Sequence, residues 1–339
     1  MEVSAIRMWG ESLRAVSKKK PDTQAVTNLL QSDVSIRKII SYAKEKKVAH
    51  MHILYLDPMI LPFLLFSSNR FLRKIKITAT LHWYPNKGFK LQAINKLLAD
   101  GILNHIVVHG QNIQKELIRN LTSADEKTIS SVEYPHKSSK ILNKNVCKKK
   151  LGIIDKGPFV MFFGGLRYDK GIVEFLDAVK RIRSHLTVII AGKLSDLSQS
   201  YIEKQKSDPK LKGRVVWHVG YVPDELVNHY FGLADIVVLP YRKTHKGQSG
   251  PLIEGINQLC LILGPDCNQI GYTIRHENVG VVYSPEDYDN FVEKLDYMLK
   301  NIEELKMEKK NNLLRYRKRT SLESFKKRYI DLLASFSVE

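Results

Sequence analysis

The stretch that decides the fold is Phe159–Gly171, FVMFFGGLRYDKG, where an apolar run ends in two glycines and a charged turn. The run Phe159–Phe163 carries no polar side chain, which predicts a strand covered on both faces. Gly164 and Gly165 allow the backbone to approach a ligand closely. The amphipathic residues 171–184 predict a helix, whose N-terminus favours anions. Strand, glycine loop and helix together indicate a phosphate-binding site.

Two cations lie in this loop, Arg167 and Lys170. The guanidinium of Arg167 is planar and can donate two parallel hydrogen bonds, and the ammonium of Lys170 is a compact charge. Such a pair is suited to a diphosphate. The alternative is an ordinary turn between a strand and a helix, with both charges in water. The loop by itself leaves both interpretations open.

The alternation of apolar runs and amphipathic segments continues to residue 303. Strands are predicted at Phe159–Phe163, Leu186–Ala191, Val215–His218, Ile236–Leu239, Leu261–Leu263 and Val279–Tyr283. Helices are predicted near 171–184, 197–206, 223–232, 250–258 and 287–300. Strands that alternate with helices are typical of a parallel sheet with helices on both faces. In such a sheet, ligands bind at the carboxyl ends of the strands.

The first half of the chain shows the same alternation of apolar runs and amphipathic segments, less regularly. Its predicted strands are Val48–Leu54, Ile75–Thr80, Ile106–His109 and Ser130–Glu133. Its predicted helices lie near 33–46, 90–100 and 111–120. Residues 137–150 are rich in Lys, Ser and Asn, which predicts a linker between two α/β domains.

Composition bounds the class of protein. The chain has 339 residues, of which 43% are hydrophobic and 26% charged, and this excludes wholesale disorder. Three cysteines are too few for a disulfide framework, so we expect a reducing compartment, the cytoplasm. Residues 1–20 lack the apolar core of a signal peptide. The longest apolar stretch, Ile53–Phe66, is too short to cross a bilayer.

A second glycine-containing loop follows the predicted strand Ile236–Leu239. It contains Gly247–Gly250, GQSG, directly before a predicted helix, and its backbone N–H groups suit an anion. Glu254 lies one turn into that helix, where its carboxylate can bind the hydroxyls of a sugar. The alternative for Glu254 is that it complements the helix dipole.

In order and spacing, four motifs resemble the donor domain of retaining glycosyltransferases of the GT-B fold, family 4 in particular (glycosyl transferases group 1). They are FFGGLRYDKG (162–171), ADIVVLPYR (234–242), QSGPLIEG (248–255) and VGVVYSPEDYDNF (279–291). The resemblance implies an α/β protein with two Rossmann-like domains facing a cleft, and a C-terminal helix that returns to the N-terminal domain. We therefore expect an acceptor-side domain at 1–147, a donor domain at 148–320 and the returning helix at 321–339.

The resemblance implies a role for each matching residue of the donor domain. Arg167 and Lys170 would hold the donor diphosphate and stabilise charge on the leaving nucleotide, which makes them catalytic candidates. Glu254 corresponds to the second glutamate of the family's E-x7-E motif and would bind the ribose. The other implied donor-binding residues are Gly164, Gly165, Tyr221, Val222, Gln248, Ser249 and Gly250. The nucleotide-diphosphate sugar would be a co-substrate, with no cofactor and no essential metal.

Histidines of the first half extend the candidate site. The segment Thr78–His82, TATLH, is similar to the family's T-x-H segment, whose histidine projects toward the donor sugar and phosphate. His82 is therefore the third catalytic candidate. His109 and His136 also end strand-like runs and rank below His82. For each of them, the alternative is a structural role.

The sequence departs from the family in two places. Lys246 stands where the first glutamate of E-x7-E belongs, which bears on the contacts to the donor sugar. The family's first strand and glycine-rich loop are not recognisable before residue 33, so we expect a departed or shortened N-terminal domain.

Positive charge is concentrated in two regions. Residues 1–150 carry a net charge of +15 and Lys306–Arg328 one of +8, while the stretch between them is slightly acidic. The apolar segment Met59–Phe66 precedes a basic cluster, which fits docking on anionic lipid. The cluster consists of Arg70, Arg73, Lys74 and Lys76. The alternatives are a buried helix with a solvated basic end, and an anionic glycan as partner; nucleic acid is not expected, because no motif for it is present.

These inferences predict a cytoplasmic glycosyltransferase, peripheral on the membrane, that moves a sugar from a nucleotide-diphosphate sugar to a glycan or lipid-linked acceptor. We expect it to serve the synthesis of cell-surface polysaccharide or glycolipid with a retaining mechanism. Two alternatives stay open. Lys246 and the missing N-terminal loop favour a non-catalytic scaffold or partner protein with this fold. A sugar-nucleotide epimerase on the same plan would need acid and base carboxylates in the cleft.

Overall fold

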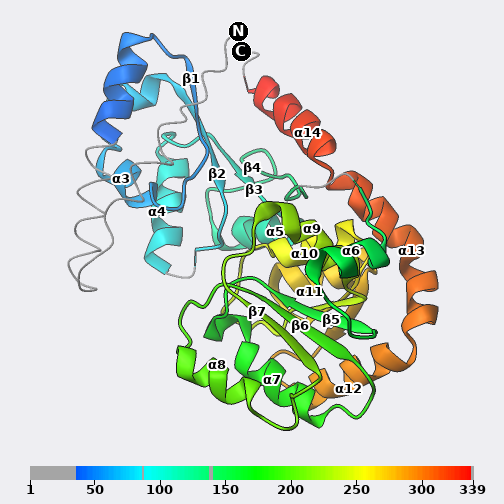
Figure 1. Cartoon of the computed structure of the whole chain (residues 1–339). Helices are drawn as coiled ribbons and strands as arrows, with labels where there is room; N and C mark the ends of the chain where they lie inside the picture. The colour runs from blue at the N-terminus through cyan, green and yellow to red at the C-terminus, as the bar shows by residue number, and fades with distance from the viewer. Residues whose placement is uncertain (1–35, 86–87, 137–139, 337–339) are drawn as a thin grey trace.

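The computed structural model describes residues 36–85, 88–136 and 140–336, which form two α/β domains (Figure 1). The N-terminal domain, blue to cyan in the figure, is built on a four-stranded sheet, and the C-terminal domain on a six-stranded sheet. The predicted fold class is therefore confirmed. The departure expected before residue 33 lies outside the described residues.

The N-terminal sheet is parallel, with the strand order β1-β2-β3-β4. Its strands are β1 (His50–Ile53), β2 (Lys76–Leu81), β3 (His105–Val108) and β4 (Ile129–Ser131). Each lies within two residues of its predicted bounds. The helical segments of this domain are 36–45, α3 (Ile60–Leu65), η1 (Leu72–Lys74), α4 (Gly88–Ala99) and α5 (Gln111–Asn120).

The two faces of this sheet differ in chemistry. Successive side chains of a strand point to opposite faces. In β2, Ile77 and Leu81 belong to an apolar cluster with the helices of the domain. Thr78 and Thr80 lie on the other face, where both hydroxyls hydrogen-bond to the imidazole of His52. One face is thus an apolar core, and the other is a polar surface.

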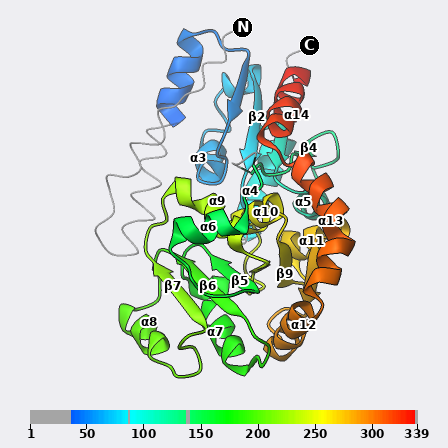
Figure 2. The same ribbon diagram turned by 45° about the vertical axis from the view of Figure 1, so that its right-hand side comes forward.

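Helix α14 (Leu322–Ser335) crosses back from the C-terminal domain and covers that polar face (Figure 2). The hydroxyl of Tyr329 hydrogen-bonds to His52 Nε2 at 2.8 Å and to the hydroxyl of Thr80. The ring of Phe336 lies 4.5 Å from that of His105. The predicted return of the C-terminal helix is confirmed. No residue of α14 is fully buried, so polar and ring contacts, rather than an apolar core, hold this helix.

The C-terminal sheet has the order β10-β9-β8-β5-β6-β7, and all its pairs are parallel. Its strands are β5 (Phe159–Phe163), β6 (Thr187–Gly192), β7 (Val215–Val219), β8 (Ile236–Val238), β9 (Leu261–Pro265) and β10 (Gly280–Tyr283). The chain leaves β5 toward β6 and later returns on the other side of β5 as β8. The connections therefore diverge at the carboxyl end of β5, which opens the crevice where such sheets bind ligands.

Helices cover both faces of this sheet. They are η2 (Tyr168–Lys170), α7 (Ile172–Arg181), α8 (Gln199–Lys206), α9 (Asp224–Leu233), α10 (Gly250–Asn257), α11 (Asn268–Glu277), α12 (Tyr288–Lys300) and α13 (Ile302–Arg319). The predicted helices at 171–184, 197–206, 223–232, 250–258 and 287–300 are present. The pattern did not indicate α11 and α13.

The segment predicted as a linker contains a helix, α6 (Lys144–Leu151). The side chain of Asn143 caps its first turn, and Gly152 ends it in the left-handed conformation. Cys147 is fully buried against α9, where its sulfur leaves no room for a side chain at Gly232. Cys147, with Leu142 and Leu151, packs this lysine-rich segment against the core of the C-terminal domain, and the expected boundary at 147/148 falls inside α6.

The apolar segment expected to touch lipid is mostly buried. Met59, Ile60 and Phe63 are each no more than 2% exposed and pack into the N-terminal core. These apolar residues therefore form a buried helix, as the alternative interpretation expected, while lipid contact of the basic cluster stays a prediction. Leu65 is an exception, with 64% of its surface exposed. Within the described ranges, no helix has both the length and the apolar character needed to cross a bilayer.

We expect acid to loosen α14, because three histidines lie beneath it. Burial, with the neighbouring His50 and His105, lowers the pKa of His52 to about 4, and burial also lowers the pKa values of His50 and His105. Such groups bind protons more readily in the unfolded chain, so the free energy of unfolding should fall between pH 6.5 and pH 4. Urea unfolding across this range measures the slope.

The variant His52→Gln separates this contribution from those of other buried histidines. It should unfold with a smaller loss of stability between pH 6.5 and pH 4 than the unchanged chain. If both proteins lose the same free energy of unfolding over this range, protonation of His52 does not weaken the docking of α14.

Candidate functional site

A cavity of about 710 Å³ lies between the two domains. Side chains and backbone from both sheets, and from α14, form its walls. The predicted site residues that line it are His82, His109, His136, Gly164, Gly165, Tyr221, Val222, Gly250 and Glu254. The remaining predicted residues, which do not line it, are Arg167, Lys170, Lys246, Gln248 and Ser249. The structure thus brings the larger part of the predicted set to one place.

The floor of the cavity is a close backbone contact between the ends of β5 and β6. A Cβ atom on Gly192 would lie 1.8 Å from the carbonyl oxygen of Gly164, and Gly192 has φ +149°. Only glycine fits there. Sequence reasoning singled out Gly164 but missed Gly192, although its position at the end of a predicted strand was a usable signal.

The two cations of this loop differ in their surroundings. The Lys170 amine would lie 2.9 Å from a Cβ atom on Gly164, so it reaches the glycine that lines the cavity. The Arg167 guanidinium is held by both oxygens of Asp169, at 2.7 and 2.6 Å. That hydrogen-bonded pairing raises the pKa of Arg167. Two N–H groups of Arg167 are thus engaged by Asp169, whereas the Lys170 amine lies directly beside Gly164.

Helix α10 begins at the cavity wall. Gly250 and Pro251 line the cavity with the first turn, and Glu254 lines it one turn later. The Ser249 hydroxyl caps the helix by accepting a hydrogen bond of 3.3 Å from the N–H of Leu252. A helix N-terminus that opens on a cavity suits a phosphate group.

The far end of the cavity on the C-terminal side is apolar. Val222 lines it together with Val227 and Phe231 of α9. Tyr221 stands at its mouth with 77% of its surface exposed. An apolar slot beside an aromatic ring suits a planar ring system such as a base.

On the N-terminal side, His82 is held in a defined orientation. Its Nε2–H donates to the carbonyl of Leu54 at 2.9 Å, and the ring of Tyr55 stacks on it at 3.9 Å. Asp57 accepts the backbone N–H groups of His82 and Trp83 at 3.1 and 2.8 Å. The chain after β1 thus positions the histidine that follows β2. Because Nε2 is used as a donor, Nδ1 is the ring atom able to accept a hydrogen bond from a ligand.

His109 stands beside His82, with ring centroids 4.9 Å apart. Its Nδ1–H donates to the carbonyl of Val132 at 3.0 Å, which makes Nε2 an acceptor. Burial lowers the pKa of His109 to about 4, so its ring is neutral at pH 7. We call His82, His109 and Tyr55 the histidine wall. It presents the Nδ1 atom of His82 and the Nε2 atom of His109 as ring atoms that can accept hydrogen bonds from sugar hydroxyls.

Two predicted residues have contacts away from the centre of the cavity. The Nε2–H of His136 donates to the carbonyl of Arg317 at 3.1 Å, so this imidazole ties the N-terminal domain to α13. The Lys246 amine lies 5.1 Å from the centroid of the Tyr84 ring, in the other domain. Tyr84 and Lys246 form a cation–π contact across the interface.

Sequence reasoning missed several residues of this site. Asp57 and Tyr55 follow the short strand β1 directly, so their position at the carboxyl end of a strand was the available signal. Lys193 follows β6 in the same way and lines the cavity. Phe325 of α14 carried no local signal, because only the return of that helix brings it to the cavity.

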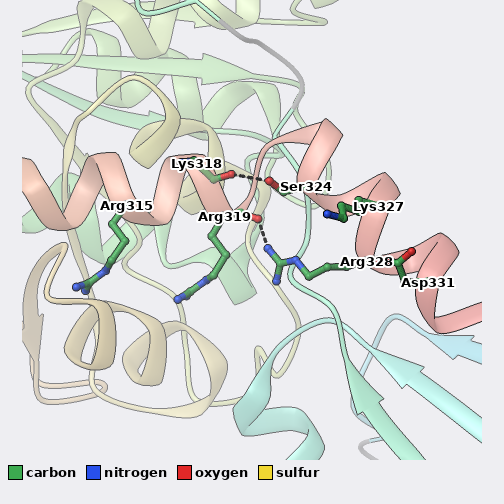
Figure 3. Close-up of a pocket in the computed structure, with 7 residues that line it drawn as sticks. All are labelled: Arg315, Lys318, Arg319, Ser324, Lys327, Arg328 and Asp331. Carbon is green, nitrogen blue, oxygen red and sulfur yellow. Dashed lines mark hydrogen bonds between the residues drawn. The ribbon is translucent and has the colours of Figure 1, made fainter.

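A second hollow, of about 410 Å³, lies outside the cleft at the corner between α13 and α14 (Figure 3). The residues that line it are Arg315, Lys318, Arg319, Ser324, Lys327, Arg328 and Asp331. Arg319 forms ion pairs with Glu277 of α11 and with Glu133 of the N-terminal domain, and Arg328 also pairs with Glu133. These charges join the two domains where the chain crosses between them.

Residues 157–301 match the family described as Glycosyl transferases group 1. This match covers most of the C-terminal sheet, including the glycine loop after β5 and the start of α10. Comparison with curated protein sequences gives no match.

The fold is similar to several solved structures. HepE from Anabaena, in complex with UDP, has a TM-score of 0.71 and 13% identity, over 88% of this chain and 82% of that one. Sucrose-phosphate synthase from Thermosynechococcus elongatus has a TM-score of 0.74 and 15% identity, over 94% and 81%. The lipopolysaccharide outer core galactosyltransferase WaaB has a TM-score of 0.67 and 13% identity, over 91% and 81%. At these identities the likeness establishes the GT-B architecture predicted above.

Asp57→Ala should release the backbone that carries His82. Loss of two acceptors should lower the free energy of unfolding by about 1–3 kcal/mol. We expect turnover of a donor sugar to fall about tenfold through misplacement of His82, while the Kd for a nucleoside diphosphate stays within twofold. Enzyme kinetics and titration calorimetry measure the two effects.

Asp125→Ala is the matched control, because Asp125 also accepts two backbone N–H groups of this domain, those of Lys127 and Thr128. It does not line the cavity. Equal losses of turnover in both variants would assign Asp57 to stability alone.

Proposed function

We propose that this chain, a glycosyltransferase with the GT-B fold and a glycosyl transferases group 1 domain at residues 157–301, transfers a sugar from a nucleotide-diphosphate sugar to a glycan or lipid-linked acceptor. One observation carries the proposal. The cavity between the domains has a glycine loop, with the Lys170 amine beside it, and a helix N-terminus on one side, and the histidine wall on the other.

The donor would lie along the C-terminal wall. Its base would enter the apolar slot beside Tyr221, and its ribose hydroxyls would meet the carboxylate of Glu254. The diphosphate would then lie between the backbone of Gly164 and the first turn of α10, with Lys170 beside it. HepE, which has a similar fold, binds UDP, and this supports a uridine nucleotide as the first donor to test.

The sugar would then face the histidine wall, where the acceptor enters. His82 and His109 would accept hydrogen bonds from hydroxyls and orient the sugar. In the proposed retaining reaction, the acceptor oxygen bonds to the anomeric carbon on the face from which the diphosphate leaves. The acceptor proton passes to a phosphate oxygen. Charge on the leaving group is met by Lys170, by Arg167 once it leaves Asp169, and by the N-terminus of α10.

A non-catalytic role is the second candidate, and the position of Lys246 favours it. Lys246 replaces an acidic residue of the family's motif, and its amine is engaged with Tyr84. The epimerase alternative needs carboxylates on both sides of a sugar. Among the residues that line the described cavity, the carboxylates are Asp224 and Glu254, both on helices of the C-terminal domain.

A membrane contact is part of the proposal for a lipid-linked acceptor. Arg70, Arg73 and Lys74 are exposed on the N-terminal domain, although most of the apolar segment before them is buried. Exposed cations attract anionic lipid by about 1 kcal/mol each. Such a surface would place the protein at the cytoplasmic face of a membrane.

Lys170→Ala should weaken UDP binding more than Arg167→Ala does. The Lys170 amine lies beside Gly164, which lines the cavity, whereas two N–H groups of Arg167 are engaged by Asp169. Loss of a charge-assisted hydrogen bond of about 1.5–3 kcal/mol should raise the Kd at least tenfold for Lys170→Ala. Titration calorimetry with UDP and with other nucleoside diphosphates measures this.

The control is Lys243→Ala, which removes an exposed lysine that pairs with Glu286 and does not line the cavity. Its Kd should match that of the unchanged chain. Unchanged affinity in Lys170→Ala would remove the loop after β5 from the nucleotide site.

Binding to vesicles should need anionic lipid and should weaken as salt rises, because screening shortens the range of the attraction. Replacing Arg70, Arg73 and Lys74 with Gln should abolish sedimentation with anionic vesicles at low salt. The control replaces Arg315, Lys318 and Lys327 in the hollow of Figure 3, which is an equal loss of charge. Equal binding to neutral and anionic vesicles would contradict the proposal that Arg70, Arg73 and Lys74 form the membrane contact. An equal loss of sedimentation in the control variant would contradict it as well.

A further inference from the structure

We propose that Gln248 and Gln269 are positioning residues. Their contacts fix the position of the donor side of the cavity, which the C-terminal domain forms, relative to the histidine wall of the N-terminal domain. Both belong to the C-terminal domain, and both hydrogen-bond to backbone groups at the start of α5 in the N-terminal domain. The proposal rests on the proposed function, because the relative position of the two sides affects a reaction only if a sugar is transferred between them.

Gln269, in the first turn of α11, is 3% exposed. Its Oε1 accepts the N–H groups of Asn112 and Ile113, at 3.1 and 3.4 Å. Its Nε2 donates to the hydroxyl of Thr273 at 2.9 Å. The first N–H groups of a helix have no partner within the helix itself. One domain therefore caps a helix of the other, and separating the domains would leave these groups unpaired.

Gln248 makes the second contact, and it connects the two sides of the cavity directly. Its Nε2 donates to the carbonyl oxygen of His109 at 2.7 Å, and the ring of His109 lines the cavity. The next residue, Ser249, caps α10, and Gly250 lines the opposite wall. A shift of His109 relative to the start of α10 would therefore break this bond.

The two amides converge on Gly110, the residue between His109 and α5. A Cβ atom there would lie 2.4 Å from Oε1 of Gln269 and 2.8 Å from Nε2 of Gln248. Gly110 also has φ +125°, which other residues rarely adopt. The glutamine side chains thus occupy the space that any larger residue at position 110 would need.

Neighbouring residues extend the contact along the same loop. Gly247 forms a backbone bridge with Trp83, and Lys246 lies over the ring of Tyr84. The chain itself crosses between the domains elsewhere, near His136 and Thr320. Rotation about that crossing is opposed by the contacts of residues 246–248 and of Gln269. Misplacement by about 1 Å is enough to slow a reaction a hundredfold.

Hydrogen exchange of the full chain tests the contact without any assay of activity. Gln269→Ala should speed exchange of the Asn112 and Ile113 amides at least tenfold. Gln269→Glu should keep them protected, because a carboxylate oxygen still accepts both N–H groups. The control is Gln258→Ala, which removes another buried amide, one that bonds to Lys140 and Leu142 away from the cavity. Unchanged exchange in Gln269→Ala would overturn the proposal.

Kinetics then tests the role in the reaction. Gln248→Met, which keeps the volume but loses the donor, should lower kcat about tenfold or more while the Kd for UDP stays within twofold. Gln269→Ala should do the same, and Gln269→Glu should restore kcat. An equal fall of kcat in Gln258→Ala, or unchanged kcat in both glutamine variants, would overturn the positioning role. If the unchanged chain binds neither UDP nor any other nucleoside diphosphate, the proposed function fails, whereas the exchange result still decides the contact.

Discussion

The geometry of the donor side depends on one backbone contact, that of Gly192 with the carbonyl of Gly164. A side chain at position 192 would lie 1.8 Å from that oxygen, so the ends of β5 and β6 come this close only because Gly192 has no Cβ atom. The contact leaves backbone exposed on the cavity floor and lets the Lys170 amine lie against it. In the proposed function, this exposed main chain is the part of the loop that would meet the diphosphate.

Part of the positive charge near the C-terminus is used inside the molecule. Arg319 and Arg328 meet Glu133 and Glu277, and Lys306 meets the buried carboxylate of Asp235. Burial opposes the ionisation of Asp235, but Lys144 and Lys306 outweigh it and lower its pKa. A charge count of the sequence treats these groups as available to a partner, although the fold has already paired them.

Local patterns predicted well wherever local packing decides the outcome. The strands of the C-terminal sheet agree with the apolar runs, because a strand buried on both faces needs apolar residues in succession. The segment Met59–Phe66 shows the limit of such reasoning. Its apolar residues are equally consistent with burial in the protein and with contact to lipid. Only the packing of α3 against the N-terminal core shows that they are buried. The burial of Cys147 is a second example. It accompanies a helix, α6, in a stretch whose composition indicated a linker.

The sequence by itself determined the two α/β domains, the two glycine loops and the histidines that follow the strands. These features depend on residues close together in the chain, so periodicity and spacing reveal them. Only the tertiary structure decided that Asp57 orients His82, that Arg167 is paired with Asp169, and that Gln248 bonds to the other domain. The interdomain contacts join residues more than a hundred positions apart. No local pattern encodes them, because they exist only once both sheets have formed and the domains have met.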